Sequence, residues 1–571
     1  MKNLKVQFKL IICILLFLNT FNILTAKNTD EFYDAKDITN YFSGILAAND
    51  NQFQKSYSYL KSLNDLEDSH YGYSQYYLYS LVALEKFNVA NNYSKKLEKK
   101  KIDNFESNLI NVVYYLERNN FDKASIYIKK IKNKSRPGST QNLLSSSLSS
   151  WINFKNTNNL NSALNLLEKI PKKFENLKNI QKTFAYCYFD SNQTDEVFRR
   201  LTSPYPSRSD VNYSRYLFFH ANYLISKNKK KKAKKILQSS LNLYPENLIL
   251  KQLNVDFEQR KFNDEFDCKN SKHVIAEILY IVASGLSMQQ NYVTSNFYLS
   301  LAKHLNPNFI SFETLYARNF FARNEYNEAK KIYNKIQKNG SVYSWHSSKQ
   351  IASILIQQEK KKEAISFLEK TFYKIKIPTS YEIFDYAEFL KNNNKYKESI
   401  KYYSKAINTI DKKHDLYGQI LDGRGVAYER IDQWDKAEAD LLNSLSISPN
   451  NAYVINYLAY SWIEKGIKIE KSLNMLKKAN ALRPNDGYII DSLGWALFKL
   501  KNYKEAKKYL QLAVKSMASD PVINDHYADS LWMNNNSLQA RFYWNYVLKL
   551  EKTEEKLKKK IKQKLLFGLK I

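Results

Sequence analysis

The chain has 571 residues and a formal net charge of +32, and 44% of its residues are hydrophobic and 14% aromatic. This apolar content excludes an intrinsically disordered chain, and the length exceeds what one compact core normally supports. Only 12 glycines and 10 prolines occur, which leaves little room for β-structure and suits helices joined by short turns.

The N-terminal stretch has the layout of a secretory signal peptide. Lys2, Lys5 and Lys9 precede an apolar run at 10–18, which is too short to span a bilayer. We expect cleavage after Ala26 and therefore a protein exported to the periplasm or cell envelope. The alternative is an uncleaved N-terminal membrane anchor.

Beyond this stretch, small residues recur, mostly at a spacing of about 34 to 39 residues. An apolar residue follows nearly every one of them by four positions, which places both on one helix face. An aromatic residue precedes many of them by three positions. The pattern predicts pairs of short helices, in which the small residue lets the second helix approach the first. The small residues are Ser56, Ala90, Ala124, Ala163, Val197, Ala233, Ser295, Ala329, Ala364, Ser399, Ala437, Ser472, Ala506 and Ala540.

The pattern is less regular in the N-terminal half of the chain. It is weakest at Thr194 and Val197, where we expect a distorted repeat. The step from Ala233 to Ser295 is too long for one repeat and too short for two. A polar, poorly periodic stretch at 257–272 lies within this step, and it predicts a connector between two arms.

Two cysteines, Cys187 and Cys268, remain after the signal stretch. An oxidising compartment would allow them to pair. However, more than two repeat units separate them, which in a straight array exceeds the roughly 7 Å limit for a disulfide. We therefore expect both thiols to be free unless the array bends sharply near Cys268.

The residue types at 40–548 resemble the tetratricopeptide repeat (TPR) family, most clearly from Asp422 onward, and 458–548 resembles TPR proteins secreted into the bacterial envelope. The resemblance implies an all-α fold, a right-handed α-solenoid of about 14–15 helix pairs. The clearest matches to the family pattern are Leu421, Gly425, Tyr428, Trp434, Ala437 and Pro449, followed by Ile490, Gly494, Tyr503 and Ala506.

The predicted organisation has five parts. They are a signal peptide (1–26), an N-terminal arm (27–256), a connector (257–272), a C-terminal arm (273–548) and a basic capping helix (549–571).

The resemblance also implies where a partner binds, because in the family the fifth and ninth positions of each unit line a concave groove. The residues that we place in this groove are Asp422, Asn456, Tyr460, Asp491, Trp495, Asp525 and Asp529, together with Trp532 one turn further on in the last unit. One interpretation is a groove of acceptors and aromatic surface for an extended peptide. The other is that each Asp or Asn bonds to the neighbouring helix and holds the units in register.

The last residues, 549–571, predict an amphipathic helix. Leu557, Ile561 and Leu565 form one stripe, and lysines surround it. We interpret this helix as a cap over the final repeat. The alternative is a basic helix that touches an anionic membrane surface.

Motifs that carry chemistry are absent from the sequence. The seven histidines are scattered without metal-ligand spacing, and no phosphate-binding loop or nucleophile elbow occurs. We therefore expect no enzymatic activity, no cofactor and no metal.

Within 421–548, acidic and basic residues nearly balance, so most of the net positive charge lies elsewhere in the chain. We interpret it as a solvated basic surface and expect no nucleic-acid partner. The sequence favours a non-enzymatic exported scaffold that binds proteins or extended peptides in envelope assembly or maintenance. The alternative is a basic envelope protein that associates with anionic lipid or glycan surfaces.

Overall fold

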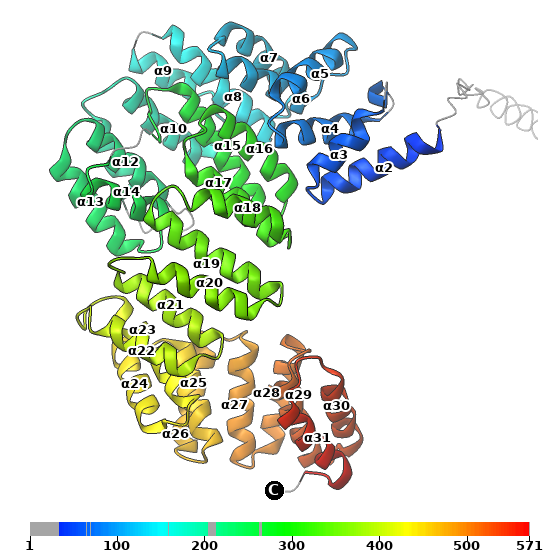
Figure 1. The fold of residues 1–571 in the computed structure, drawn as a ribbon, viewed down its shortest axis with the longest axis vertical. Coiled ribbons are helices and arrows are strands. Elements are labelled where there is room, and N and C mark those ends of the chain that lie inside the picture. Colours follow the sequence, from blue (N-terminus) through cyan, green and yellow to red (C-terminus); the bar gives the residue numbers. More distant parts are fainter. Residues whose placement is uncertain are drawn as a thin grey trace, which may run out of the picture. The chain divides into compact units, whose positions relative to one another are not determined.

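A computed structural model describes residues 34–63, 66–68, 70–157, 159–203, 213–261 and 265–569, so the expected signal peptide lies outside the described residues. Across these ranges the chain forms 30 α-helices and no strand, which confirms the predicted all-α solenoid class (Figure 1). Contacts divide the chain into unit 1, Met1–Ser347, and unit 2, Ser348–Ile571. The segment 257–272 that we predict as a connector falls inside unit 1.

Unit 1 begins with α2 (Ala35–Asn49), α3 (Phe53–Lys61), α4 (Tyr71–Ala83), α5 (Phe87–Lys99), α6 (Phe105–Glu117), α7 (Phe121–Lys134), α8 (Thr140–Asn153), α9 (Leu160–Leu167), α10 (Glu175–Tyr188) and α11 (Thr194–Thr202). It continues with α12 (Ser214–Ser226), α13 (Lys230–Leu243), α14 (Leu248–Glu258), α15 (Ser271–Met288), α16 (Tyr292–Leu305), α17 (Ile310–Ala322) and α18 (Tyr326–Ile336). Helix α19 (Ser341–Gln357) spans the division between the units.

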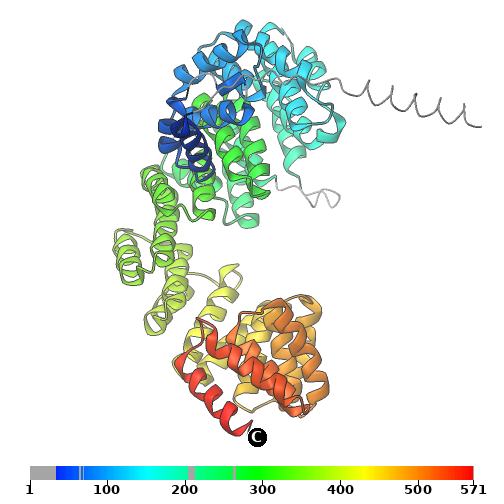
Figure 2. The same cartoon turned by 90° about the vertical axis from the view of Figure 1, so that its right-hand side faces the viewer.

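Unit 2 continues with α20 (Lys361–Tyr373), α21 (Ser380–Asn392), α22 (Tyr396–Ile407), α23 (Leu416–Glu429), α24 (Trp434–Ile447), α25 (Ala452–Glu464) and α26 (Ile469–Leu482). Its last helices are α27 (Gly487–Lys499), α28 (Tyr503–Ser516), α29 (Pro521–Met533), α30 (Ser537–Lys549) and α31 (Glu555–Phe567). Helix α31, red in Figure 2, packs on α30. Its Ile561 is fully buried.

The turn inside each helix pair explains why the pattern predicts hairpins. In the pair α4–α5, Glu85 adopts a positive φ and Phe87 then starts the second helix. The small residue Ala90 follows on the first turn and is fully buried. The same order recurs in later pairs, for example at Asn394, Tyr396 and Ser399.

Two glycines of unit 2 are required for the close approach of paired helices. A Cβ atom on Gly425 would lie 2.9 Å from Leu441, and one on Gly494 would lie 2.7 Å from Leu510. Real Cβ contacts are not that short, so any other residue would push the two helices apart.

The weak repeat at α11 has a shifted register. Val197 is only half-buried, whereas Thr194 and Phe198 are buried. The Thr194 hydroxyl donates to the carbonyl oxygens of Ser191 and Tyr186, at 2.7 and 2.9 Å. Thr194 therefore occupies the place of the small residue that the pattern assigns to Val197.

Unit 1 is not a straight array, because its later helices return to its earlier ones. Helix α15 packs against α8, and α16 packs against α4 and α6, as the green and blue helices of Figures 1 and 2 show. The ring centroids of Tyr79 and Phe297 lie 4.6 Å apart. Lys303 forms an ion pair with Glu85 at 2.7 Å. The chain thus folds back on itself.

This return explains why our expectation of two free thiols is wrong. Cys187 and Cys268 form a disulfide, with their Cα atoms 5.9 Å apart. Phe266 packs on Phe219 with a centroid distance of 4.4 Å, and the Asn222 amide donates to the Phe266 carbonyl oxygen at 2.8 Å. Phe266, two residues before Cys268, is therefore held against α12, and straight-array spacing does not apply.

Candidate functional site

The predicted groove residues lie on the first helices of the last repeats, α23, α25, α27 and α29. On α27, the Asp491 carboxylate lies 3.0 Å from Nδ1 of His526 on α29, and both side chains are buried. Burial disfavours the charged form of His526. The negative charge of Asp491, followed by those of Asp525 and Asp529, favours that form more strongly. The pKa of His526 is therefore raised.

Trp495 is part of the same cluster. Its ring stacks on His526 at 3.9 Å and on Phe498 at 4.7 Å, and its Nε1 donates to Glu464 at 2.7 Å. Tyr460 lies at the edge of the cluster, with its ring 6.4 Å from that of His526. Trp495 is buried, and its only polar atom is bonded inside the protein.

The carboxylates of Asp525 and Asp529 contact the last helix, α31, and not solvent. Lys564 of α31 lies 2.7 Å from a carboxylate oxygen of each. Asp529 also accepts from Nε1 of the fully buried Trp544 at 3.0 Å. Burial opposes the charge of Lys564, but the two carboxylates raise its pKa. Lys564 thus compensates two buried acidic groups.

Trp532 is covered by the end of the chain. Its ring lies 5.4 Å from that of Trp544, and the Arg541 guanidinium lies 5.5 Å from its centroid. A Cβ atom on Gly568 would lie 2.3 Å from Trp532, so the backbone after α31 rests directly on the indole.

Asp422 and Asn456 differ from the other acceptors of the predicted groove. Within the described residues, no hydrogen bond reaches the Asp422 carboxylate, and the buried Oδ1 of Asn456 has no partner. Burial raises the pKa of Asp422 to about 6, while Lys391 lowers it and Glu388 raises it further. These two acceptors are half-buried and uncommitted.

The structure therefore divides the predicted residues into three sets. Tyr460, Asp491 and Trp495 gather around His526, and Asp525, Asp529 and Trp532 gather around the C-terminal end. Asp422 and Asn456 belong to neither cluster. Sequence reasoning missed Glu464, His526 and Lys564, although His526 follows Asp491, and Lys564 follows Asp529, by one repeat length.

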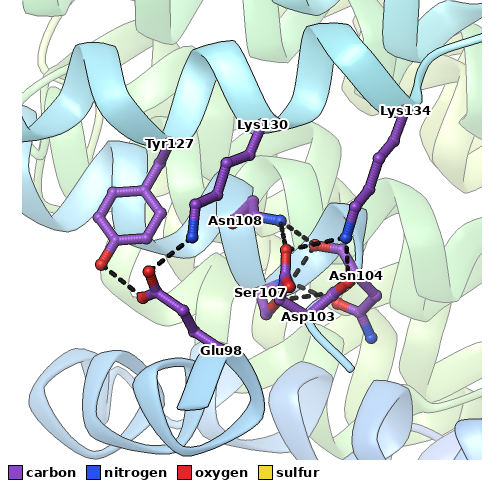
Figure 3. Close-up of polar contacts among 8 residues, drawn as sticks. All are labelled: Glu98, Asp103, Asn104, Ser107, Asn108, Tyr127, Lys130 and Lys134. Atoms are coloured by element: carbon purple, nitrogen blue, oxygen red, sulfur yellow. Dashed lines mark hydrogen bonds and ion pairs between the residues drawn. The ribbon is translucent and has the colours of Figure 1, made fainter. Parts of the chain in front are cut away.

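Polar pairs between neighbouring repeats also occur in unit 1 (Figure 3). Glu98 of α5 accepts from Tyr127 at 2.9 Å and from Lys130 at 2.5 Å, both on α7. Lys134 contacts Asp103 at 3.0 Å. Such cross-repeat pairing favours a structural role for many of the ordered acidic groups.

No group of three or more His, Cys, Asp or Glu side chains in the described ranges is arranged to hold a metal ion. In the same ranges, every helix is too short or too polar to cross a lipid bilayer.

A tetratricopeptide repeat family model matches residues 321–553. This segment is thus similar to the tetratricopeptide repeat family. A TPR repeat-containing protein of Pseudomonas aeruginosa is 26% identical over 129 residues, which are 23% of this chain and 21% of that protein. TPR scaffolds typically mediate protein–protein interactions and are generally non-catalytic.

Some solved structures are partly similar to this chain. The Cut9–Hcn1 hetero-tetramer of the APC/C is 12% identical, with 94% of this chain and 97% of that chain covered and a TM-score of 0.38. MamA from Desulfovibrio magneticus is 15% identical, and the match covers 31% of this chain and 97% of that chain, with a TM-score of 0.27. A TPR protein of Thermus thermophilus is 14% identical, and the match covers 33% of this chain and 100% of that chain, with a TM-score of 0.29.

Proposed function

We propose that this protein is an exported, non-enzymatic scaffold that binds partner proteins through the first-helix face of unit 2, in assembly or maintenance of the cell envelope. The array at 321–553 supports the scaffold role. The signal-like N-terminal sequence supports export. The observation that carries the binding face is the pair of uncommitted acceptors, Asp422 and Asn456.

The chemistry of this face selects an extended peptide. A half-buried carboxylate and a side-chain amide oxygen without partners are acceptors, so they favour backbone N–H groups or a basic side chain. Asp491, Asp525 and Asp529 already have internal donors. Binding is therefore centred on α23 and α25 and not on the whole predicted series.

The test is photo-crosslinking in cells from a reactive amino acid placed at Val426, which lies one helical turn after Asp422. In Asp422→Lys the new charge opposes a basic segment, and we expect the crosslinked partners to be lost. The matched control is Asp432→Lys, in the exposed turn after α23. An unchanged set of adducts in the Asp422 variant, with its melting temperature preserved, would contradict the proposed face.

The C-terminal end of unit 2 favours a second candidate function, attachment to an anionic lipid surface. Leu538 and Phe542 on α30 and Leu566 and Phe567 on α31 are all exposed. They flank the contact in which Arg541 donates to the Leu565 carbonyl oxygen. Exposed lysines accompany them on α31, at Lys556, Lys559, Lys560 and Lys562. Apolar side chains among cations suit a surface of negative charge.

Cosedimentation with phosphatidylglycerol vesicles and with phosphatidylcholine vesicles tests this second function. We expect binding to the anionic vesicles only, with loss at high salt and in the double variant Leu566→Ser/Phe567→Ser. Leu512→Ser, an exposed change on α28, is the control. Equal binding by the double variant and the parent would exclude this surface.

A further inference from the structure

A cavity of about 510 Å³ lies in unit 1, beside the Cys187–Cys268 disulfide. Its apolar lining includes four aromatic rings, those of Phe198, Phe218, Phe219 and Phe266. A wider depression of about 870 Å³ shares the wall formed by Gln252, Asp256, Lys261 and Glu265. The cavity therefore combines an aromatic interior with a polar wall, a combination typical of ligand sites.

Polar groups without hydrogen-bond partners occur in the wall, at Glu265, and beside it, at Asn306 and Tyr343. The Glu265 carboxylate accepts no hydrogen bond within the described residues. The Asn306 amide donates to the Glu265 carbonyl oxygen at 2.9 Å, yet its own Oδ1 is buried without a partner. The hydroxyl of Tyr343, a fully buried residue, has no hydrogen-bond partner and lies within electrostatic range of Glu265 and Asp256. Buried polar groups without partners indicate a missing ligand or water.

Two groups of the wall, Gln252 and Asp256, are held in place. Gln252 donates to Asp256 at 2.8 Å and accepts from the Val342 amide at 3.1 Å, so both ends of its side chain are committed. A Cβ atom on Gly340 would lie 2.3 Å from Gln252, so glycine is needed there. Hydrogen bonds thus fix Gln252 and Asp256 relative to each other.

The electrostatics of the wall favour a positive ligand. Burial, followed by the nearby charge of Asp256, raises the pKa of Glu265 to about 7. Burial likewise raises the pKa of Asp256, although Gln252 and Lys261 oppose the shift. Three lysines line the cavity, of which Lys227 and Lys269 are paired with Asp190 and Lys261 lies in the wall itself. The pKa of each carboxyl group is raised in spite of Lys261, so a further cation beside them would stabilise their charged forms.

We propose that this cavity binds an organic cation, an ammonium or guanidinium group carried on an aromatic or apolar body. The cationic head donates to Glu265 and Asp256, and the body lies among the phenylalanine rings. Both a free amine and an arginine or lysine side chain of a peptide have this chemistry. The site belongs to unit 1 and is independent of the face proposed on unit 2.

Titration calorimetry and ligand-observed NMR on the full chain, with its disulfide intact, test the proposal. The probes are phenethylamine, a free amine, and N-acetyl-Phe-Arg-amide, a peptide. Phenylacetate and phenylethanol are the anionic and neutral counterparts of the amine. We expect saturable binding of at least one cation and none of the two counterparts. Binding of phenethylamine alone indicates a small amine as the natural ligand, whereas binding of the dipeptide indicates a partner's side chain.

Glu265→Gln keeps the size of the side chain and removes its negative charge. We expect this variant to weaken binding of the cation at least about ten-fold, as expected for loss of one charged hydrogen bond. Glu258→Gln, on the exposed end of α14, is the matched control and leaves the affinity unchanged. Absence of saturable binding by either cation, or equal affinity in Glu265→Gln and the parent, would overturn the proposal.

Discussion

Nδ1 of His526 lies 3.0 Å from the Asp491 carboxylate, and the two side chains belong to successive first helices of the array. The contact is buried, and Trp495 covers one face of the imidazole. A residue that the family pattern places in a binding groove therefore joins two repeats.

Replacing Asp491 by Asn removes the partner of a buried cation. We expect a loss of about 3 kcal/mol in the free energy of unfolding of unit 2, because breaking a buried pair leaves an uncompensated charge. Chemical denaturation monitored by tryptophan fluorescence measures it. Asp432→Asn makes the same chemical change in an exposed turn and leaves stability nearly unchanged. Equal stability of the two variants would show that the pair contributes nothing.

The raised pKa of His526 predicts the direction of a pH effect. A group whose folded pKa exceeds the unfolded value, about 6.5, contributes stability that is fully present below that value. This contribution is lost as the pH rises through the folded pKa. The difference in melting temperature between the parent and His526→Asn is therefore larger at pH 6 than at pH 9. A difference that grows toward pH 9 would contradict the assignment.

Lys564→Met leaves Asp525 and Asp529 buried without their cation. We expect a loss of about 3 to 5 kcal/mol, again because an uncompensated buried charge is costly. Adding Asp525→Asn and Asp529→Asn removes the unpaired charges and recovers part of this loss. Lys562→Met, at an exposed position of α31, is the control. If the triple variant is no more stable than Lys564→Met, the three groups do not act together.

Replacing glycine by alanine is expected to lower stability at Gly494 and to raise it at Gly285. In Gly494→Ala the added Cβ atom meets Leu510 at 2.7 Å, and we expect a loss of about 1 to 3 kcal/mol. Gly285→Ala adds a methyl group in open space within α15, and we expect a gain of up to about 1 kcal/mol. Thermal melts of both variants measure the contrast.

Removal of the disulfide tests whether the chain of unit 1 folds back so that Cys187 and Cys268 come together. Cys187 and Cys268 are 81 residues apart, and a crosslink closing a loop of this size restricts the unfolded chain by about 4 to 5 kcal/mol. We expect Cys187→Ser/Cys268→Ser to unfold at clearly lower denaturant concentration than the parent. Thiol titration of a denatured, unreduced chain that begins at residue 27, and so lacks Cys13, gives no free thiol, and two free thiols would exclude the bond.

The sequence predicts the helix pairs well, because their determinants are local. Small residues such as Ala90 and the glycine Gly494 mark close helix contacts within one hairpin. The return of α15 and α16 onto α4, α6 and α8 depends on contacts between residues far apart in the chain, such as Tyr79 with Phe297. No local pattern encodes such a contact, so the disulfide was not predicted.

The candidate groove was only partly predictable for a similar reason. Position within the repeat identifies Asp491 and Asp529 as residues of the first-helix face. It does not reveal that His526 and Lys564, one repeat later, complete their hydrogen bonds. Comparing each acidic residue with the residue one repeat further on would have found both pairs.

The closure of unit 1 also sets the order in which the chain can fold during synthesis. In a linear repeat protein each hairpin docks on the previous one as soon as it emerges. Here Asn51 donates to Glu325 at 2.7 Å, a contact across 274 residues. The hairpin α2–α3 therefore gains this contact only after residue 325 has been made, and until then it is covered less completely than in the folded unit.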